Sequence, residues 1–329
     1  PFREHEATPK TVFALYLVVP ALLFVPVTLY LYQSDGLKQQ IEQSGSFQAL
    51  LQDRERYTKP AFQYHYVCQA NKHSAAMIEG PDCVTGAKNE TPRALLWGDS
   101  HAAHHVGYLS EIAHFEGFSI RNLELGNCPP TLFGSIEFVD KRTRDQCVAF
   151  REMIKRQLAN YDMVVIGGVW ANYLRHEGFE SNLRKTLEFI TQRGGNVILL
   201  GQIPRFESYD RNCLLRNERF LEVDCIGRAN TRVERHQVEN DQIRALAASN
   251  AAIEYMDLSD YLCQGRCSPY NDGVPIYFDQ GHLSIYGSHS LGQIQPSPFS
   301  RLFAGIRQPG PRTARTEKRG RSATAATLD

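Results

Sequence analysis

The chain has 329 residues, and its 36 basic and 36 acidic side chains give a formal net charge of zero. Hydrophobic residues make up 42% and charged residues 22%, which is ordinary for a globular protein with one sizeable domain. Because the charges balance and no basic recognition motif occurs, we expect no nucleic-acid partner.

Residues 12–32 are the first predicted element, an apolar stretch without a charged side chain. Its length matches the ~20 residues that cross a bilayer, and Pro20 and Pro26 are tolerated in membrane helices. A secretory signal peptide is the alternative, but its apolar core is shorter, roughly 7–15 residues, and a small-residue cleavage site follows it. We therefore expect one transmembrane helix at 12–32.

Basic residues lie on both sides of this stretch, with a small excess before it. Arg3 and Lys10 precede it and Lys38 follows it. This bias predicts a cytoplasmic junction at 1–11 and an outward location for the rest of the chain. We also expect the chain to be a piece of a longer protein, because it begins at Pro1 rather than at a methionine.

All eight cysteines follow the apolar stretch, and they lie in pairs of near neighbours. An even count at short spacings favours disulfides in an oxidising compartment, which agrees with the outward location. A zinc site is the weaker interpretation, because no Cys-x-x-Cys pair occurs. Many connectivities are open to eight cysteines, and pairing by proximity gives Cys68–Cys83, Cys128–Cys147, Cys213–Cys225 and Cys263–Cys267.

The remaining chain divides into three parts. Residues 33–91 are polar and mixed, with a helix expected near 37–54, and we interpret them as a linker or extension. From 92 to 294, short apolar runs alternate with amphipathic stretches, which predicts an α/β domain with a parallel sheet covered on both faces. The stretch 295–329 is rich in Pro, Arg, Thr and Ala, so we expect it to be disordered. The predicted strands of the domain are 94–97, 118–125, 163–167, 196–200 and 252–258, and its predicted helices are 102–116, 143–160, 179–193 and 232–248.

A serine follows the first predicted strand in the sequence Gly98-Asp99-Ser100-His101. Sites in open parallel sheets form outside the carboxyl ends of the strands, and the free N–H groups of a helix N-terminus favour a developing oxyanion. Ser100 is therefore a candidate nucleophile. The alternative is an ordinary helix cap, for which Asp99 or Ser100 would serve.

An aspartate and a histidine lie three residues apart near the end of the domain, at Asp279 and His282. A hydroxyl is a poor nucleophile at neutral pH unless a base takes its proton. Histidine suits that task, and a carboxylate on its other ring nitrogen fixes the tautomer and stabilises the imidazolium. Each motif alone is a weak signal, but together they predict a Ser100–His282–Asp279 triad.

The GDSH sequence after the first strand and the DQGHLS sequence at 279–284 resemble the SGNH (GDSL-like) hydrolase superfamily. More narrowly, they resemble the SGNH domains fused behind membrane acyltransferase-3 domains. The sequence GNCPP at 126–130 resembles the second block of those domains, and VVIGGVWANY at 164–173 stands where the third block belongs. The first three residues, PFR, resemble the junction that follows the acyltransferase helices. The resemblance covers roughly 1–293 and implies a three-layer, flavodoxin-like fold.

The resemblance also implies roles for single residues. Ser100 corresponds to the nucleophile, His282 to the general base and acid, and Asp279 to the residue that orients the imidazole. The oxyanion hole would use the N–H groups of Ser100 and Gly126 and the side chain of Asn172. Many superfamily members carry Gly-x-Asn-Asp in the third block, whereas this chain has Gly-Val-Trp-Ala-Asn, so Trp170 is the alternative occupant of the third position.

Members of the fused family O-acetylate bacterial surface polysaccharides. The resemblance therefore implies transfer of an acyl group, acetyl in the first place, to a hydroxyl of a polysaccharide such as a lipopolysaccharide O-antigen. The partner would be a membrane acyltransferase-3 domain with acetyl-CoA as the ultimate donor, and the SGNH domain itself would bind no cofactor. It would lie in the periplasm, held to the bacterial inner membrane by the span in the lipid bilayer. A carbohydrate esterase with water as acceptor and a non-catalytic envelope domain are the alternatives.

Two other groups of residues invite a functional interpretation. The histidines His101, His104 and His105 suggest a metal, but no acidic or cysteine partner and no HExxH motif accompany them, so we expect none. Aromatic side chains can stack on a sugar, but they more often fill the core. The four candidates here are Tyr64, Tyr66, Trp170 and Tyr173.

Overall fold

The structure is a computed structural model. It describes residues 9–34, 45, 48, 49, 52, 59, 60, 67–87, 91–219, 223–263, 265–294 and 299–306. Most of the predicted helix at 37–54 lies outside the described residues, as do Tyr64 and Tyr66.

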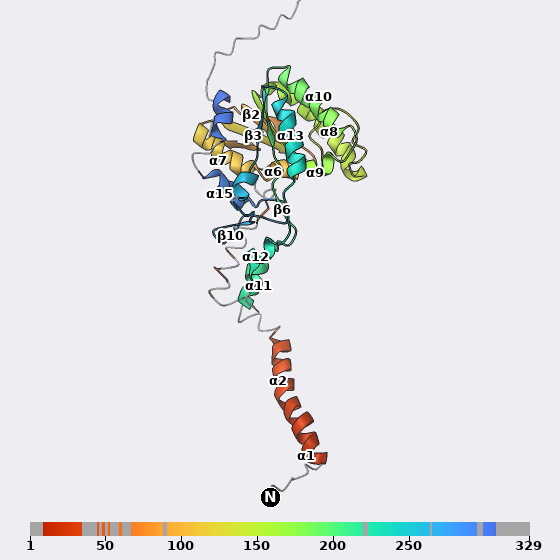
Figure 1. The fold of residues 1–329 in the computed structure, drawn as a ribbon, viewed down its shortest axis with the longest axis vertical. Coiled ribbons are helices and arrows are strands. Elements are labelled where there is room, and N and C mark those ends of the chain that lie inside the picture. The colour runs from red at the N-terminus through yellow and green to blue at the C-terminus, as the bar shows by residue number, and fades with distance from the viewer. Residues whose placement is uncertain are drawn as a thin grey trace, which may run out of the picture.

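One apolar helix near the N-terminus runs through three consecutive segments, α1, η1 and α2 (Figure 1). It is long and apolar enough over Lys10–Gln33, 24 residues, to cross a membrane, and it is not buried against the rest of the chain. Its π-helical turn lies just before Pro20, which has no N–H to continue an α-helical pattern. The expected apolar helix at 12–32 is confirmed as a candidate span. The segments are Pro9–Phe13, Ala14–Val18 and Val19–Gln33.

A six-stranded sheet with the order β1-β3-β2-β4-β5-β8 forms the centre of the domain. Every strand predicted from the sequence is present, and these strands pair in parallel. Strand β1 was not predicted; it is three residues long, partly buried and antiparallel to β3 at the sheet edge. The strands are Val84–Gly86 (β1), Ala94–Gly98 (β2), Ser119–Glu124 (β3), Met163–Gly167 (β4), Asn196–Leu200 (β5) and Ile253–Met256 (β8).

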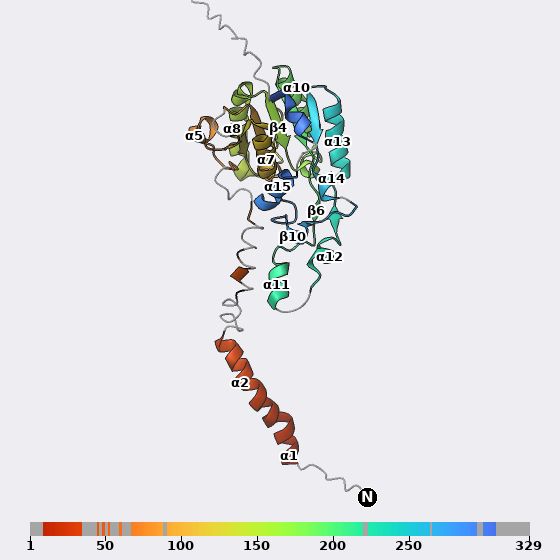
Figure 2. The same cartoon turned by 90° about the vertical axis from the view of Figure 1, so that its left-hand side faces the viewer.

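Helices cover both faces of this sheet, and the arrangement can be followed in Figures 1 and 2. Alternate strand residues divide between two apolar cores: Leu96 and Val165 belong to one, Leu95 and Val164 to the other. Such a pattern requires cover on both faces, so the three-layer α/β fold is confirmed. The first core is closed by Val106–Glu116 (α7) and Ile285–Gly292 (α15), and the second by Lys141–Gln157 (α8), Phe179–Thr191 (α10) and Gln237–Ala248 (α13).

Two predicted helices differ from the observed ones. The helix predicted at 102–116 is split at His104 and His105 into α6, Ser100–Ala103, and α7. The helix predicted at 232–248 starts five residues late, because Val233–Glu234 pairs as strand β7 with Arg205–Phe206, strand β6. His236 then takes a left-handed conformation, with φ of 53°, as the chain turns from this ribbon into α13.

Short elements complete the domain. The first two are Ala75–Glu79 (α5) and Trp170–Tyr173 (α9), and Leu158–Asn160 (η3) extends α8. The others, all in the second half of the chain, are Cys213–Arg219 (α11), Cys225–Ala229 (α12), Ser259–Leu262 (α14), Tyr270–Asn271 (β9), Val274–Pro275 (β10) and Ser300–Ile306 (η4).

All four predicted disulfides are present, and no free cysteine occurs. They indicate an oxidising, extracytoplasmic compartment. The Cys68–Cys83 bridge lies beside Asn122 of β3, whose side chain bonds the N–H of Cys68 and the carbonyl of Cys83 at 2.7 and 2.9 Å. Residues 67–87 therefore belong to the folded domain, so the predicted domain start at 92 was wrong.

The predicted disorder of 295–329 was also wrong for one segment. In η4, the side chains of Phe303 and Ile306 are buried, and the Phe303 ring stacks on Phe118 at 5.4 Å between centroids. The Arg93 guanidinium donates a hydrogen bond to the carbonyl of Ile306. The segment has apolar side chains that dock on α7, a local feature that the average composition of the tail conceals.

We predict that Phe303→Ala lowers the free energy of unfolding by about 3–5 kcal/mol, because it leaves a cavity beside Phe118. Denaturant unfolding of the whole chain in detergent measures this change. Phe115→Ala is the matched control, since that ring is 58% exposed, and its effect should stay within ~0.5 kcal/mol. Equal effects of the two substitutions would mean that η4 does not dock as described.

Candidate active site

The structure brings Ser100, His282 and Asp279 together. His282 Nε2 lies 3.0 Å from Ser100 Oγ, and His282 Nδ1 lies 2.9 and 3.0 Å from the two carboxylate oxygens of Asp279. An ionised carboxylate only accepts hydrogen bonds, so Nδ1 carries the proton and Nε2 is free to accept from the serine hydroxyl. This is the geometry that a serine nucleophile with a histidine base requires.

The nucleophile stands on a tight turn between β2 and α6. Strand β2 ends at Gly98, where a Cβ atom would lie 1.9 Å from the carbonyl oxygen of Gly167 in the neighbouring β4. Glycine at this position therefore lets the two strand ends approach. Asp99 caps α6 by accepting a hydrogen bond from His101 N at 2.7 Å. Because Asp99 is the cap, the Ser100 hydroxyl is left for His282.

The loop that carries Asp279 and His282 is fixed on both sides. Tyr277 and Leu283 form an antiparallel bridge, and the N–H of Phe278 donates to the carbonyl of His282 at 2.8 Å. The hydroxyl of Tyr277 donates to the carbonyl of Pro204 at 2.9 Å, beyond the end of β5. The loop is therefore held against the carboxyl edge of the sheet, where Ser100 lies.

Asp279 is held as a carboxylate. Burial alone would raise its pKa, but hydrogen bonds and charge from the His282 ring, with hydrogen bonds from the N–H groups of Gly281 and His282, lower the pKa to about 2. The side chain consequently stays ionised at neutral pH, as a residue that orients and stabilises an imidazolium must.

Asp99 connects the nucleophile turn to the third sequence block. Its Oδ2 accepts hydrogen bonds from the Tyr173 hydroxyl at 2.6 Å and from Val169 N at 3.1 Å. Burial raises the pKa of Asp99, and these bonds together with the one from His101 N oppose that rise. A buried carboxylate with three donors fixes the geometry of both segments.

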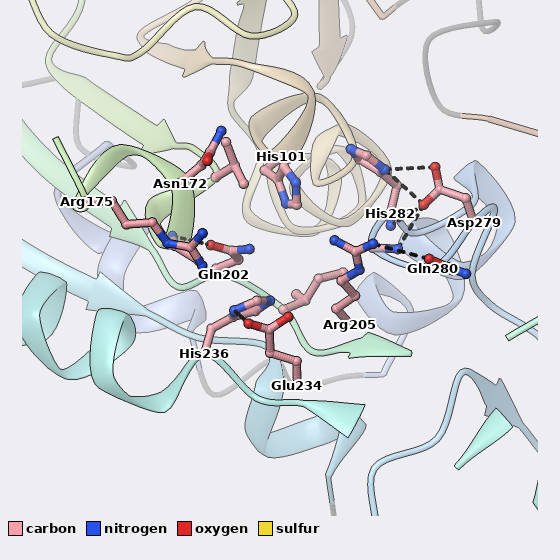
Figure 3. A pocket seen from close by; sticks show the side chains of 14 residues that line it. His101, Asn172, Arg175, Gln202, Arg205, Glu234, His236, Asp279, Gln280 and His282 are labelled. Carbon is pink, nitrogen blue, oxygen red and sulfur yellow. Dashed lines mark hydrogen bonds and ion pairs between the residues drawn. The ribbon is translucent and has the colours of Figure 1, made fainter. Parts of the chain in front are cut away.

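Of the three residues expected to form the oxyanion hole, Ser100 stands on the turn between β2 and α6, and the other two lie next to cavities at the site. Gly126 follows β3, and a Cβ atom there would lie 3.2 Å from Gln69 Nε2, a group that lines a small cavity with Ser100. Asn172 of α9 lines a larger cavity with His101 and His282 (Figure 3). Their roles as donors remain predictions.

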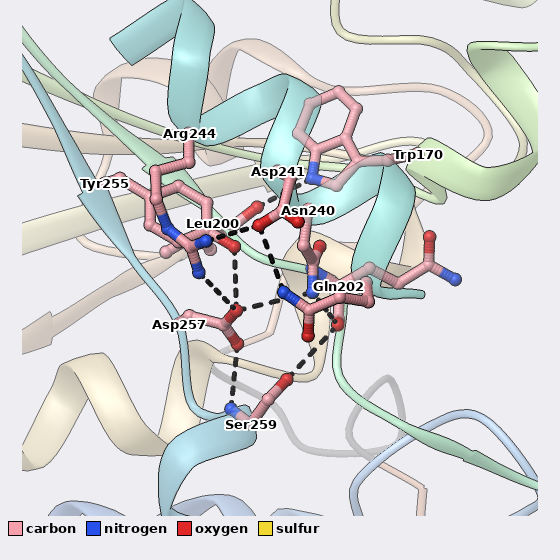
Figure 4. Close-up of polar contacts among 10 residues, drawn as sticks. Trp170, Leu200, Gln202, Asn240, Asp241, Arg244, Tyr255, Asp257 and Ser259 are labelled. Carbon is pink, nitrogen blue, oxygen red and sulfur yellow. Dashed lines mark hydrogen bonds and ion pairs between the residues drawn. The ribbon is translucent and has the colours of Figure 1, made fainter. Parts of the chain in front are cut away.

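The alternative that placed Trp170 in the oxyanion hole is wrong. The indole is fully buried, and its N–H donates to the carbonyl of Leu200 at 2.6 Å (Figure 4). Tyr173 is also buried, with its hydroxyl on Asp99. Neither aromatic ring can stack on a sugar, and both belong to the core.

Two cavities flank the triad. The larger has a volume of about 480 Å³ and is bounded by Asp279 and His282 at one end (Figure 3). The smaller, of about 80 Å³, lies at Ser100, and its surface is mostly apolar although polar residues also line it; the apolar residues are Pro60, Phe278 and Leu283. An acyl group on Ser100 would thus have a small apolar space on one side and a polar cavity on the other.

A hydrogen-bond network holds the far wall of the larger cavity (Figure 4). The side chain of Asn240 in α13 accepts from Gln202 N at 2.8 Å and donates to Gln202 O at 2.9 Å, as a neighbouring strand would. Gln202 Oε1 in turn accepts from Ala171 N at 2.9 Å, and Asp257 accepts from Asn240 Nδ2 at 3.3 Å. These bonds fix α9, and with it Asn172.

The structure also brings His101 and His104 beside His282. Burial, reinforced by the neighbouring imidazoles, lowers the pKa of His101 and His104 well below the ordinary value, so both rings are neutral. Their ligand nitrogens and that of His282 all lie within 4.8 Å of one another. One ion with bonds of about 2.0–2.1 Å requires its nitrogens within ~4.2 Å, so this cluster would have to contract to hold zinc. His105 lies outside the cluster, and burial lowers its pKa to about 3.

We predict that Tyr173→Phe lowers the free energy of unfolding by about 1–3 kcal/mol and also lowers kcat for ester hydrolysis, because Asp99 loses a buried donor. Unfolding curves and steady-state kinetics on the same preparations measure both. Tyr286→Phe, on α15, is the control for loss of a tyrosine hydroxyl elsewhere. Wild-type values of both quantities in Tyr173→Phe would refute the connecting role of Asp99.

The depressed pKa of Asp279 makes a second prediction about stability. A group whose pKa is lower in the folded state stabilises that state above its unfolded pKa, 3.8, and loses the effect as the pH falls through about 2. The difference in unfolding free energy between wild type and Asp279→Asn should therefore shrink between pH ~4 and pH ~2. Thermal unfolding across this range measures it, and a constant difference would contradict the assignment.

Comparisons with known proteins identify the family of the domain. Residues 67–295 match the family model described as the SGNH domain fused to AT3 domains. Among solved structures, the periplasmic domain of a lipopolysaccharide acetyltransferase of Salmonella ser. Paratyphi A is 16% identical, with a TM-score of 0.48 over 70% of this chain and 94% of that chain. A protein assigned as an acylhydrolase from Bacteroides fragilis is 15% identical, with a TM-score of 0.42 over 72% and 98%. A sequence search of curated proteins gives no match. Because the family model covers more than half of the chain, this protein belongs to the SGNH domain family.

Proposed function

We propose that the chain transfers an acyl group, acetyl in the first place, to a hydroxyl of a cell-surface polysaccharide such as a lipopolysaccharide O-antigen. The observation that carries this proposal is the His282 imidazole, which is hydrogen-bonded both to Ser100 Oγ and to the Asp279 carboxylate. Family membership supports acyl transfer or ester hydrolysis as the class of reaction.

The first half of the reaction forms an acyl-enzyme. His282 Nε2 takes the Ser100 proton as Oγ attacks the acyl carbonyl, and Asp279 stabilises the imidazolium. The oxyanion is stabilised by the N–H groups of Ser100 and Gly126 and by the Asn172 side chain, where one donor is worth on the order of 3 kcal/mol. The bond to the leaving group then breaks, and that group departs with the proton from His282.

The second half transfers the acyl group. The acceptor hydroxyl gives its proton to His282 and attacks the acyl carbon, and Ser100 recovers the proton when the ester bond to its oxygen breaks. A sugar hydroxyl gives an O-acylated glycan, whereas water gives hydrolysis. The 480 Å³ cavity beside His282 has room for a sugar, which both transfer to a glycan and hydrolysis of a glycan ester require.

The small cavity at Ser100 supports a short acyl group. It has a volume of about 80 Å³, and Phe278 and Leu283 contribute to its walls. Each further methylene would have to displace these side chains, and exclusion of one methylene is commonly worth about 1–3 kcal/mol.

The cellular setting of this reaction is part of the proposal. The apolar helix would hold the domain at the periplasmic side of the bacterial inner membrane, with the bilayer around residues 12–32. The family description supports an AT3 domain as partner. In this scheme acetyl-CoA is the ultimate donor, and its acetyl group reaches Ser100 through that partner, while the SGNH domain holds no cofactor of its own.

We predict that the chain hydrolyses a chromogenic acetyl ester slowly and that Ser100→Ala and His282→Ala abolish the activity. Asp279→Asn should lower kcat by about 10⁴-fold, as in a serine protease triad. His114→Ala is the matched histidine control, since His114 is exposed on α7, and it should keep the wild-type rate. Equal rates in all variants would favour the non-catalytic alternative.

The choice between transferase and esterase needs an acceptor. With a polysaccharide present, the proposal predicts that labelled acetyl groups are transferred to the glycan instead of to water. Mass spectrometry of the glycan detects the label. Rapid hydrolysis that stays unchanged when acceptors are added would instead establish that the chain is an esterase.

A further inference from the structure

The cavity beside His282 is lined by charged side chains that the triad does not use. Arg175, just after α9, and Arg205, in β6, both extend toward the cavity from opposite walls (Figure 3). Its other polar side chains come from separate elements as well, and include Gln202, Glu234 and His236. None of these residues belongs to the triad or to the expected oxyanion hole.

The charges of this lining do not cancel locally. Glu234 lies opposite Arg205 in the register of the β6–β7 ribbon, but its carboxylate lies 3.5 Å from His236 Nδ1, and the Arg205 guanidinium donates to Gln280 Oε1 at 3.3 Å. Asp279 is occupied by the His282 ring and two backbone N–H groups. Arg175 forms no hydrogen bond or ion pair with any residue that the structure describes. Neither Arg175 nor Arg205 forms an ion pair within the described part of the chain, so both guanidinium groups are available to an anionic ligand.

A buried imidazole beside the arginines gives independent support for a ligand. The His236 side chain is 4% exposed, and neither ring nitrogen has a hydrogen-bond partner within the described part of the chain; Glu234 lies 3.5 Å from Nδ1. His101 Nδ1, which lines the same cavity, also lacks a partner there. An unsatisfied buried polar atom costs about 1–3 kcal/mol, so such atoms usually meet a ligand or water in the working protein.

We infer that this cavity binds an acidic sugar of the acceptor glycan, whose anionic group pairs with Arg175 and Arg205 while its hydroxyls meet His236 and His101. The inference rests on the proposed function, because it names the acceptor class of that reaction. A guanidinium binds a carboxylate or a phosphate through two parallel N–H···O bonds, and both anions share this chemistry. The cavity volume of about 480 Å³ suits one monosaccharide unit.

Binding to the whole chain in detergent tests the inference without turnover, in the Ser100→Ala background. The ligands are methyl glucuronide, methyl glucoside and glucose 6-phosphate, which present a carboxylate, a neutral group and a phosphate on the same ring. We expect one of the two anionic sugars to bind at least tenfold more tightly than methyl glucoside, as a charge-assisted pair worth about 1.5–3 kcal/mol predicts. Whichever anion binds more tightly identifies the anionic group.

Substitutions then assign the effect to the arginines. Arg175→Gln and Arg205→Gln should each remove most of the preference for the anionic sugar. Arg184→Gln is the matched control, because Arg184 lies on α10 in an exposed pair with Glu180, and it should retain the preference. Equal binding of the three sugars, or a preference that survives both cavity substitutions, would overturn the inference.

A separate measurement distinguishes a failure of the acidic-acceptor inference from a failure of the acyl-transfer proposal. Hydrolysis of a neutral acetyl ester by the chain with Ser100 intact reports on the triad alone. If hydrolysis occurs and the anionic preference is absent, the acidic acceptor is wrong while the proposed function stands. If the preference is present and hydrolysis is absent, the site binds an acidic sugar but the acyl-transfer proposal fails.

Discussion

The hydrogen bond between Ser100 Oγ and His282 Nε2 joins two residues that are 182 positions apart, and the rest of the domain is arranged so that it can form. Ser100 lies at the end of β2 in the middle of the sheet, whereas His282 lies on a loop after the last strand of the sheet. The packing of α15 on α7, the bridge between Tyr277 and Leu283, and the bond from Tyr277 to Pro204 bring that loop to the nucleophile. Two segments that are distant in the sequence, those of Ser100 and His282, therefore meet at the contact through which the proton is transferred.

The environment of this contact separates charged from neutral groups. Asp279 stays ionised because donors surround it, while burial keeps His101 and His104 neutral next to the catalytic imidazole. A second positive charge beside His282 would oppose its protonation, so neutral neighbours allow the imidazolium to form during proton transfer. The positive charge that the site does carry, at Arg175 and Arg205, lies instead in the polar cavity, where an acceptor would bind.

Much of this arrangement was predictable from the sequence because it depends on local patterns. The strand at Ala94–Gly98 is a continuous apolar run, and the Asp279–His282 spacing fits one turn. The cysteine pairs are near neighbours, which made proximity a sufficient guide. These features needed no knowledge of how distant segments pack.

Features that arise only from packing between distant segments escaped prediction. The β6–β7 ribbon has two residues in each strand, too few for a periodic signal, and the left-handed His236 follows from its turn into α13. The η4 segment docks through contacts with distant residues, such as Phe303 on Phe118 and the carbonyl of Ile306 on Arg93. For the same reason, the convergence of Arg175, Arg205 and His236 on one cavity appears only in the folded chain.

The central claim is that Ser100 carries the acyl group between donor and acceptor. The most direct measurement is mass spectrometry of peptides from the chain, quenched in acid shortly after mixing with an activated acetyl ester. The account predicts one acetyl group on the peptide that contains Ser100, and a loss of this species when an acceptor sugar is added before the quench. Acetylated sugar that forms while Ser100 stays unmodified at every time point would contradict it.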